Sequence, residues 1–300
     1  MKKKIGPLLL RGLMIGPILG SGIILLPPLA YSKLGSSAIW SWVIIMTLGA
    51  LFAMIFSKLS IVYPGDGGMT IAIEKSLGKK FKLYASFLMI SAVSFGPTAV
   101  MLTASDYLGK LTILKGININ YIAMALVFVS FLLLLKDIKF ISTLSFIFSS
   151  VITVILFVSS IVVLFQKGIN IAPISDVQWI PSLKAVMLLF WAIIGWEIVG
   201  NYSDQVKDLK KTIPAATTIS LIVITMTYII IALSIQTFPY SAELSLVNIL
   251  YVIFGELSVT ILALLVSGLC LCTYLLIVGA LARLINTLST EEYLPKFMGK

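Results

Sequence analysis

Glu197 is the one acidic side chain that lies well inside an apolar stretch of this sequence, at the end of the segment FWAIIGWE that begins at Phe190. A carboxyl group in hydrocarbon is costly because its ionised form loses its hydration, so such a residue is a functional candidate by default. Taking up and releasing a proton is the chemistry that we expect of Glu197. The structural alternative is a lone buried acid that only hydrogen-bonds a neighbouring helix.

A second apolar segment, GPILGSGIILLPPLA at residues 16–30, is interrupted by Gly20, Ser21 and Gly22 and ends in a pair of prolines. Small residues permit non-helical backbone and the close approach of a ligand. The N–H groups at the start of the following half-helix would receive an anion such as a carboxylate. The structural alternative is that Pro27 and Pro28 end the span and the glycines only pack against other helices.

The two interrupted segments together favour a ligand with both charges. A carboxylate would bind at Gly20, Ser21 and Gly22, and an ammonium group would bind the carbonyls released around Ile194 and Gly195. A zwitterionic amino acid fits both ends, as expected where paired discontinuous helices meet near the middle of a membrane.

The composition places these segments in a membrane. The 300 residues are 59% hydrophobic and 11% charged, against about 45–50% and about 25% in soluble domains. The absence of His excludes zinc sites built on imidazole and Ser-His-Asp triads. Cys270 and Cys272 are two residues apart, hence on different faces of a helix, and are expected to be packing residues. We therefore predict an integral membrane protein with no metal and no cofactor.

Eight apolar runs are long enough, or nearly so, to cross a hydrocarbon core of about 30 Å. A removable signal peptide at the N-terminus is the less favoured interpretation of the first run, because Arg11 interrupts it and no clean cleavage site follows. The predicted spans are Leu8–Tyr31, Ile39–Val62, Leu83–Leu108, Tyr121–Leu135, Phe140–Phe165, Leu183–Tyr202, Ala215–Thr237 and Leu257–Leu284.

The basic residues orient these spans. With the N-terminus in the cytoplasm, only five of the 22 Lys and Arg residues fall outside, namely Lys33, Lys110, Lys115, Lys167 and Lys184. By the positive-inside rule, both termini are therefore expected to be cytoplasmic, in a multi-pass protein of the cell membrane, with the loops at 175–181 and 240–245 outside. The net charge of +10 is explained mostly by topology, so no nucleic-acid partner is predicted.

Four motifs in order along the chain resemble the amino acid–polyamine–organocation superfamily of permeases. The first is the Gly-Ser-Gly break followed by prolines, and the second is Tyr63-Pro64 with Gly67-Gly68. The third runs from Phe190 to Pro214, FWAIIGWEIVGNYSDQVKDLKKTIP, and the fourth is Leu294-Pro295-Lys296. The second motif and Phe95-Gly96-Pro97 also resemble bacterial exporters of neutral and branched-chain amino acids.

The resemblance implies roles for particular residues. Gly20, Ser21 and Gly22 would bind the substrate carboxylate, and backbone around Trp191 and Ile194, with Gly195, would bind its ammonium group. Trp191 would gate or stack on the substrate, with an interfacial or packing aromatic as the alternative. Glu197 matches an acidic position linked to gating or proton response. Phe140–Phe165 lacks the basic residue of some proton-coupled relatives, so the resemblance does not imply proton coupling by that residue.

The resemblance also implies the fold: an all-α polytopic membrane protein built from inverted five-helix repeats, with helices 1 and 6 discontinuous. Residues 1–182 would form the first repeat, and residues 183–300 would form a second repeat with only three helices. The expected function is secondary active transport of amino acids by alternating access, neutral ones above all, including antiport. The alternative is a truncated, non-transporting remnant or an accessory membrane subunit.

Other classes fit less well. An intramembrane enzyme would need a second acid or a nucleophile–base pair near Glu197, and none lies within a span. A channel would need recurring rings of polar residues, and none recur. The expected partners are an amino acid substrate, the lipid bilayer and a coupling proton, while the oligomeric state stays open.

Overall fold

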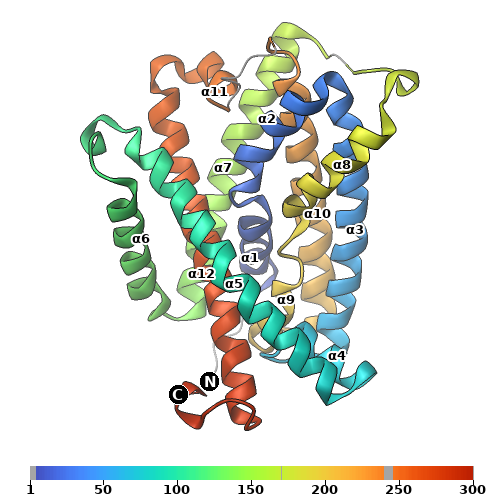
Figure 1. Cartoon of the computed structure of the whole chain (residues 1–300), viewed down its shortest axis with the longest axis vertical. Helices are drawn as coiled ribbons and strands as arrows, with labels where there is room; N and C mark the ends of the chain where they lie inside the picture. Colours follow the sequence, from blue (N-terminus) through green and yellow to red (C-terminus); the bar gives the residue numbers. More distant parts are fainter. Residues whose placement is uncertain (1–4, 170, 240–245, 300) are drawn as a thin grey trace.

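The computed structural model describes residues 5–169, 171–239 and 246–299 as helices with short connections (Figure 1). Within these ranges no β-strand occurs, and one isolated bridge pairs Ile5 with Val206. The α-helices are α1 (Pro7–Leu19), α2 (Gly22–Leu34), α3 (Ala38–Val62), α4 (Met69–Leu77), α5 (Lys79–Gly109), α6 (Ile119–Leu134), α7 (Ile138–Lys167), α8 (Trp179–Leu189), α9 (Ile198–Asn201), α10 (Leu209–Ile235), α11 (Leu246–Phe254) and α12 (Ser258–Thr290). The 3-10 turns are η1 (Gly35–Ser37), η2 (Thr112–Leu114), η3 (Ile174–Asp176), η4 (Phe190–Ile193), η5 (Ser203–Gln205), η6 (Gly255–Leu257) and η7 (Lys296–Gly299).

Six helical stretches of the described residues are long and apolar enough to cross a membrane, which confirms an all-α, multi-pass protein. They are Pro7–Val62, Lys79–Gly109, Ile138–Lys167, Trp179–Asn201, Leu209–Ile235 and Leu246–Thr290. The first contains two of the predicted spans, and the predicted Tyr121–Leu135 corresponds to the shorter apolar helix α6. The count of eight spans therefore stays a prediction.

Helix α1 lies in the middle of the bundle and packs against α7, α10 and α12, while α5 runs obliquely across α12 (Figure 1). Glycine lets α7 approach α1 closely. A Cβ atom at Gly12 would lie 2.6 Å from the backbone of Phe146, and the Ser145 hydroxyl donates a hydrogen bond to the Gly12 carbonyl at 2.8 Å. Small residues at a helix contact inside a membrane have this effect because they bring the backbones together.

The first helix is broken between α1 and α2. Gly20 has φ 37° and ψ −144°, which ends α1, and Ser21 is the N-cap of α2. The predicted non-helical segment extended through Gly22, but Gly22 is already the first residue of α2. Pro27 and Pro28 lie inside α2 and do not end it, since a membrane helix tolerates the loss of single backbone hydrogen bonds at proline.

A second break separates α8 from α9 at the predicted Ile194 and Gly195. After η4, Ile194 is extended with φ −73° and ψ 135°, and Gly195 has φ 126°, a value that only glycine adopts readily. Helix α9 then begins at Ile198 with Glu197 as its N-cap. The predicted boundary between repeats, after residue 182, falls inside α8, and the division into repeats stays a prediction.

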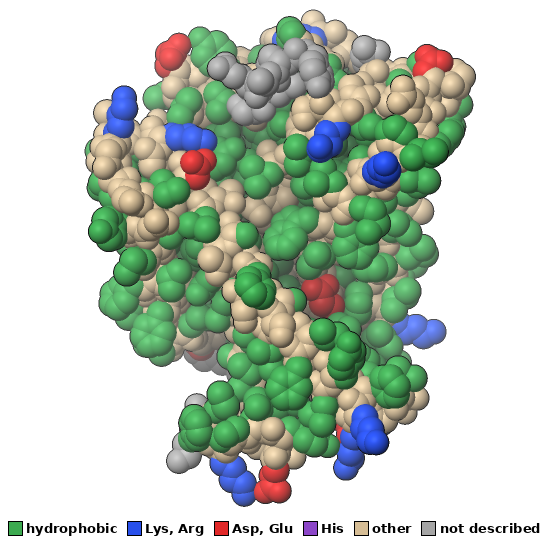
Figure 2. Space-filling model, in the orientation of Figure 1, with side chains coloured by type: hydrophobic (Ala, Val, Ile, Leu, Met, Phe, Trp, Pro, Cys, Tyr) green, Lys and Arg blue, Asp and Glu red, His purple; other side chains and the backbone are tan. Residues whose placement is uncertain are grey.

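The two ends of the bundle differ. The end of α12 and the turn η7 lie at one end, and the segment 175–181, where α8 begins, lies at the other (Figure 1). The predicted loop at 240–245 lies outside the described residues. On the face drawn in Figure 2, hydrophobic side chains cover the middle and charged side chains gather toward the two ends. This is the surface expected of a protein surrounded by lipid.

Candidate functional site

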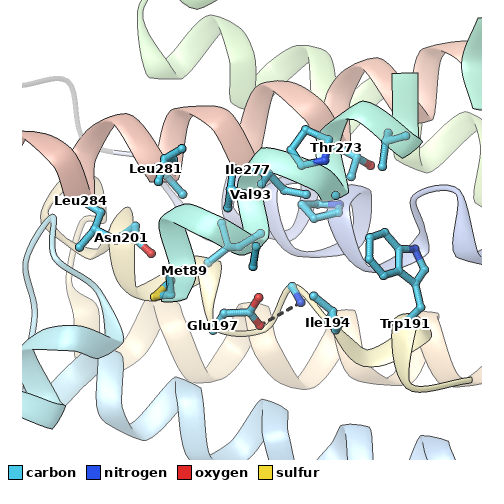
Figure 3. A pocket seen from close by; sticks show the side chains of 18 of the residues that line it. Met89, Val93, Trp191, Ile194, Glu197, Asn201, Thr273, Ile277, Leu281 and Leu284 are labelled. Carbon is cyan, nitrogen blue, oxygen red and sulfur yellow. Dashed lines mark hydrogen bonds between the residues drawn. The ribbon is translucent and has the colours of Figure 1, made fainter. Parts of the chain in front are cut away.

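A cavity of about 220 Å³ lies where both helix breaks face α5 and α12 (Figure 3). Most of its wall is apolar. The lining residues are Pro17, Ser21, Met69, Met89, Ala92, Val93, Gly96, Pro97, Val100, Trp191, Ile194, Gly195, Glu197, Ile198, Asn201, Thr273, Ile277, Ala280, Leu281 and Leu284. The cavity can therefore hold a small molecule against the backbone of the two breaks.

Few polar side chains reach the cavity, and they come from different elements. Ser21 is 5% exposed and makes no capping hydrogen bond to α2. On α12, the Thr273 hydroxyl lies 3.1 Å from the Gly16 carbonyl and 2.9 Å from that of Leu269. Thr273 thus ties the last turn of α1 to α12 beside the first break.

Trp191 reaches across one end of the cavity, opposite Leu284 (Figure 3). A Cβ atom at Gly22 would lie 3.3 Å from Cδ1 of Trp191, and one at Gly96 would lie 3.5 Å from its Cη2. The indole therefore spans the distance between α2 and α5. This position suits a side chain that closes the cavity at that end.

The Glu197 carboxylate belongs to the second break itself. Its Oε2 atom accepts a hydrogen bond of 2.9 Å from the backbone N–H of Gly195, the bond drawn in Figure 3. Glu197 lines this cavity and also a much smaller one beside Ser60, Gly68 and Gly200. The carboxyl group thus stabilises the break, in a residue that lines both cavities.

Toward the end of the bundle with η7, an amide hydrogen bond and an ion pair lie next to the cavity wall. Met69, Asn201 and Leu284 line its lower wall. The Asn201 amide donates to the Asp66 carbonyl at 2.9 Å, and Arg283 forms an ion pair of 2.8 Å with the Asp66 carboxylate. The residues just before α4 are therefore held to α9 and α12 below the cavity.

A second ionic cluster lies at the same end. The buried Lys82 ammonium group lies 2.6 Å from Glu74 of α4 and 2.5 Å from Glu291, which follows α12. The hydrogen bond from Lys82 lowers the pKa of Glu74. Lys82 and Arg283 count among the basic residues that predict the orientation in the membrane, and the structure also gives both of them acidic partners.

The family model described as amino acid permease matches residues 5–300, almost the whole chain. The chain belongs to the amino acid permease family. The match confirms the family resemblance seen in the four motifs, and it identifies a transporter and not an enzyme.

Named relatives of this permease are transporters as well. It is 24% identical to the uncharacterised amino acid permease YecA of Bacillus subtilis, over 96% of this chain and 69% of the relative. It is 27% identical to the cadaverine/lysine antiporter of Escherichia coli, over 72% of this chain and 50% of that protein. It is 22% identical to the L-methionine/branched-chain amino acid exporter YjeH of Escherichia coli, over 76% of this chain and 55% of the exporter. This permease thus spans half to about two thirds of the length of these relatives.

The predicted site residues come together only in part. Ser21, Trp191, Ile194, Gly195 and Glu197 all line the one cavity. Gly20 and Gly22 are not among its lining residues, because Gly20 turns the chain and Gly22 lies behind Ser21 against α10. The roles assigned to these residues stay predictions.

The sequence analysis did not predict the residues of α5 and α12 that line the cavity. Met89 and Val93 of α5, and Thr273 and Ile277 of α12, lie in long apolar runs in which no charge or glycine marks them. Asn201 was missed as well, although a side-chain amide near the end of an apolar segment was a signal that could have been used.

Proposed function

We propose that this permease is a secondary active transporter that moves neutral amino acids across the cell membrane by alternating access, as an exchanger. The observation that carries the proposal is the single cavity lined by both helix breaks. Residues from two segments far apart in the sequence, Ser21 and Gly195, meet there. Such a meeting of broken helices supplies backbone donors and acceptors in a place without bulk water.

The start of α2 would receive the substrate carboxylate. The first N–H groups of a helix have no partner within it and carry the positive end of the helix dipole. At α2 these groups belong to the stretch that begins with Ser21 and Gly22, and the Ser21 hydroxyl adds a further donor. Gly20 contributes by turning the chain so that this helix start faces the cavity.

The second break would receive the substrate ammonium group. Ile194 is extended and Gly195 has a positive φ, so the carbonyls of this stretch leave the helical hydrogen-bonding pattern. Backbone around Trp191, Ile194 and Gly195 would thus accept hydrogen bonds from the ammonium group. The Trp191 indole would stack on the bound substrate and separate it from the far end of the bundle.

The apolar wall of α5 and α12 supports a neutral side chain on the substrate. Met89 and Val93 of α5 and Ile277 and Leu281 of α12 all line the cavity (Figure 3). A cationic side chain would need an acidic partner. Among the described residues that line the cavity, Glu197 is the one acid, and it bonds the Gly195 N–H. The name of the methionine and branched-chain exporter agrees with this preference, whereas that of the cadaverine/lysine antiporter does not.

Exchange in proteoliposomes tests the proposal. Proteoliposomes that contain the purified chain and are loaded with unlabelled leucine should take up labelled leucine and methionine faster than labelled lysine or cadaverine. Val93→Trp should abolish the exchange because the indole fills the cavity. Val129→Trp, an exposed position on α6, is the matched control and should leave exchange unchanged.

Two results would contradict the proposal. Faster exchange of lysine or cadaverine would overturn the neutral preference while leaving transport itself in place. A folded, thermally stable chain that exchanges none of these substrates would support the alternative of a non-transporting remnant or an accessory membrane subunit.

A further inference from the structure

Tyr228 of α10 is a buried tyrosine directly behind the first helix break. Its side chain is 0% exposed, and its hydroxyl lies 3.1 Å from the carbonyl oxygen of Ile18 and 3.3 Å from that of Leu19. These are the last two residues of α1. One O–H group is thus shared between two carbonyls that α1 leaves without helical partners.

The ring of Tyr228 is held in place independently of its hydroxyl. It stacks on Trp42 of α3, with 4.9 Å between the ring centroids and 23° between the planes. Trp42 is also completely buried. The orientation of the hydroxyl toward α1 is therefore set by packing between α3 and α10, and the hydrogen bonds use a group that is already positioned.

The same hydroxyl contacts the other side of the break. A Cβ atom at Gly22, the first residue of α2, would lie 2.9 Å from the Tyr228 oxygen. The next nearest atom, Cδ1 of Trp191, would lie 3.3 Å away. The end of α1 and the start of α2 therefore meet at the Tyr228 oxygen, and the Trp191 indole lies on another side of Gly22.

We propose that Tyr228 is the positioning residue of the substrate site, whose hydroxyl fixes the end of α1 against the start of α2 and requires glycine at position 22. It does not line the cavity, and it acts through the backbone of Ile18, Leu19 and Gly22. The inference deepens the proposed function and rests on it for the transport measurements below.

Tyr228→Phe removes the hydroxyl and keeps the ring on Trp42. The KM for leucine exchange should rise about tenfold, near the upper end of what one lost hydrogen bond contributes. The maximal rate per folded molecule should stay within about twofold, because the cavity walls are unchanged. A variant that only lost folded protein would show an unchanged KM, with a lower total rate but the same maximal rate per folded molecule.

Thr227→Val is the matched control. Thr227 is the neighbouring buried residue, and its hydroxyl donates at 2.7 Å to Val223 of its own helix. This variant also loses one buried hydroxyl from α10, but the hydrogen bond that it loses lies within α10 itself. Its KM should equal that of the parent, and an equal rise of KM in both variants would overturn the inference.

Gly22→Ala tests the contact from the other side. In the parent the new methyl group meets the Tyr228 oxygen, so the KM should rise strongly. In the Tyr228→Phe background that oxygen is absent, so the same substitution should raise the KM several-fold less. Residues in direct contact show such non-additivity, and purely additive effects would contradict the proposal.

Hydrogen–deuterium exchange separates this inference from the proposed function. Backbone amides of residues 21–25 should exchange faster in Tyr228→Phe than in the parent and in Thr227→Val, because the start of α2 loses its anchor. This result does not require any transport activity. If the amides of residues 21–25 exchanged hydrogen for deuterium at the parent's rate in Tyr228→Phe, the role of Tyr228 would be overturned even if leucine transport is confirmed.

Discussion

The two helix breaks that meet in the cavity are held in different ways. The first, at Gly20 and Ser21, is fastened by side chains from other helices, Tyr228 of α10 and Thr273 of α12. The second, at Gly195, is fastened by a residue of its own segment, since Glu197 accepts from the Gly195 N–H. One break is therefore part of the bundle packing, and the other is largely a local structure.

This difference bears on movement. A break held by its own segment keeps its shape when neighbouring helices shift, because its hydrogen bond moves with it. A break held from α10 and α12 changes whenever those helices move relative to α1. Under the proposed alternating access, we therefore expect the first break to respond to rearrangement of the bundle and the second to move as a unit.

Gly195→Ala should have the largest effect. Gly195 has φ 126°, and a Cβ atom there would lie 2.9 Å from Cγ1 of Ile18. The backbone strain alone is about 1–3 kcal/mol, and the contact with α1 adds to it. We expect loss of exchange activity and a clearly lower melting temperature in detergent.

Gly96→Ala is the control for that change. Gly96 also lines the cavity, but it lies within helix α5, and a Cβ atom would meet only Trp191 at an ordinary 3.5 Å. Its melting temperature should match that of the parent. Equal destabilisation by both substitutions would show that cavity volume, and not the conformation of the break, is what matters.

Substitution of Glu197 should have the next largest effect. Two different substitutions distinguish its proposed role in protonation from its role as the hydrogen-bond acceptor of Gly195. Glu197→Gln keeps an oxygen that can accept from the Gly195 N–H but fixes a neutral state. If Glu197 gates or couples transport by protonation, the pH dependence of exchange should flatten while the KM stays unchanged. Glu197→Ala also removes the hydrogen bond, so its KM should rise as well. Rates measured between pH 5 and pH 8 test both.

A Glu197→Gln variant with the pH profile of the parent would contradict the proton role. Glu197 would then be only the hydrogen-bond acceptor of the second break. Asp176→Asn, at an exposed turn at the other end of the bundle, is the control for non-specific loss of a negative charge. Its pH profile should not change.

This contrast also explains what the sequence could predict. The second break was placed correctly because its causes are adjacent in the chain, with Gly195 two residues before Glu197. The membrane class followed equally from local composition. The predicted first break included Gly22, one residue more than the structure shows. The end of α1 at this break is bonded by Tyr228, about two hundred positions away in the sequence. Nothing in the apolar run around Tyr228 marks it as a partner of α1.

Thr273→Val should have a smaller effect than Tyr228→Phe. The Gly16 carbonyl that Thr273 contacts also receives the N–H of Gly20 at 2.9 Å, so it keeps one partner when the hydroxyl is lost. We expect a rise of about two- to threefold in the KM for leucine, within the range of one weak hydrogen bond. Thr287→Val, whose hydroxyl bonds its own helix at Arg283, is the control on α12. A Thr273 variant with a larger effect than Tyr228→Phe would reverse the order of the two anchors.

The smallest effect is expected outside both breaks, at the ionic cluster of Lys82. The hydrogen bond from Lys82 lowers the pKa of Glu74 below its unfolded value of about 4.3. This carboxylate therefore contributes stability above that unfolded value and loses the contribution as the pH falls through the folded pKa.

At pH 7, Glu74→Gln should lower the melting temperature only slightly, because Glu291 still lies 2.5 Å from Lys82. Below about pH 5 the melting temperature of the parent should fall more steeply than that of Glu74→Gln. Glu292→Gln, which removes an exposed ion pair with Lys296, should follow the parent, since exposed pairs contribute little. If Glu74→Gln also changed the KM for leucine at pH 7, the ionic cluster would be coupled to the breaks, and the separation between the two regions would be wrong.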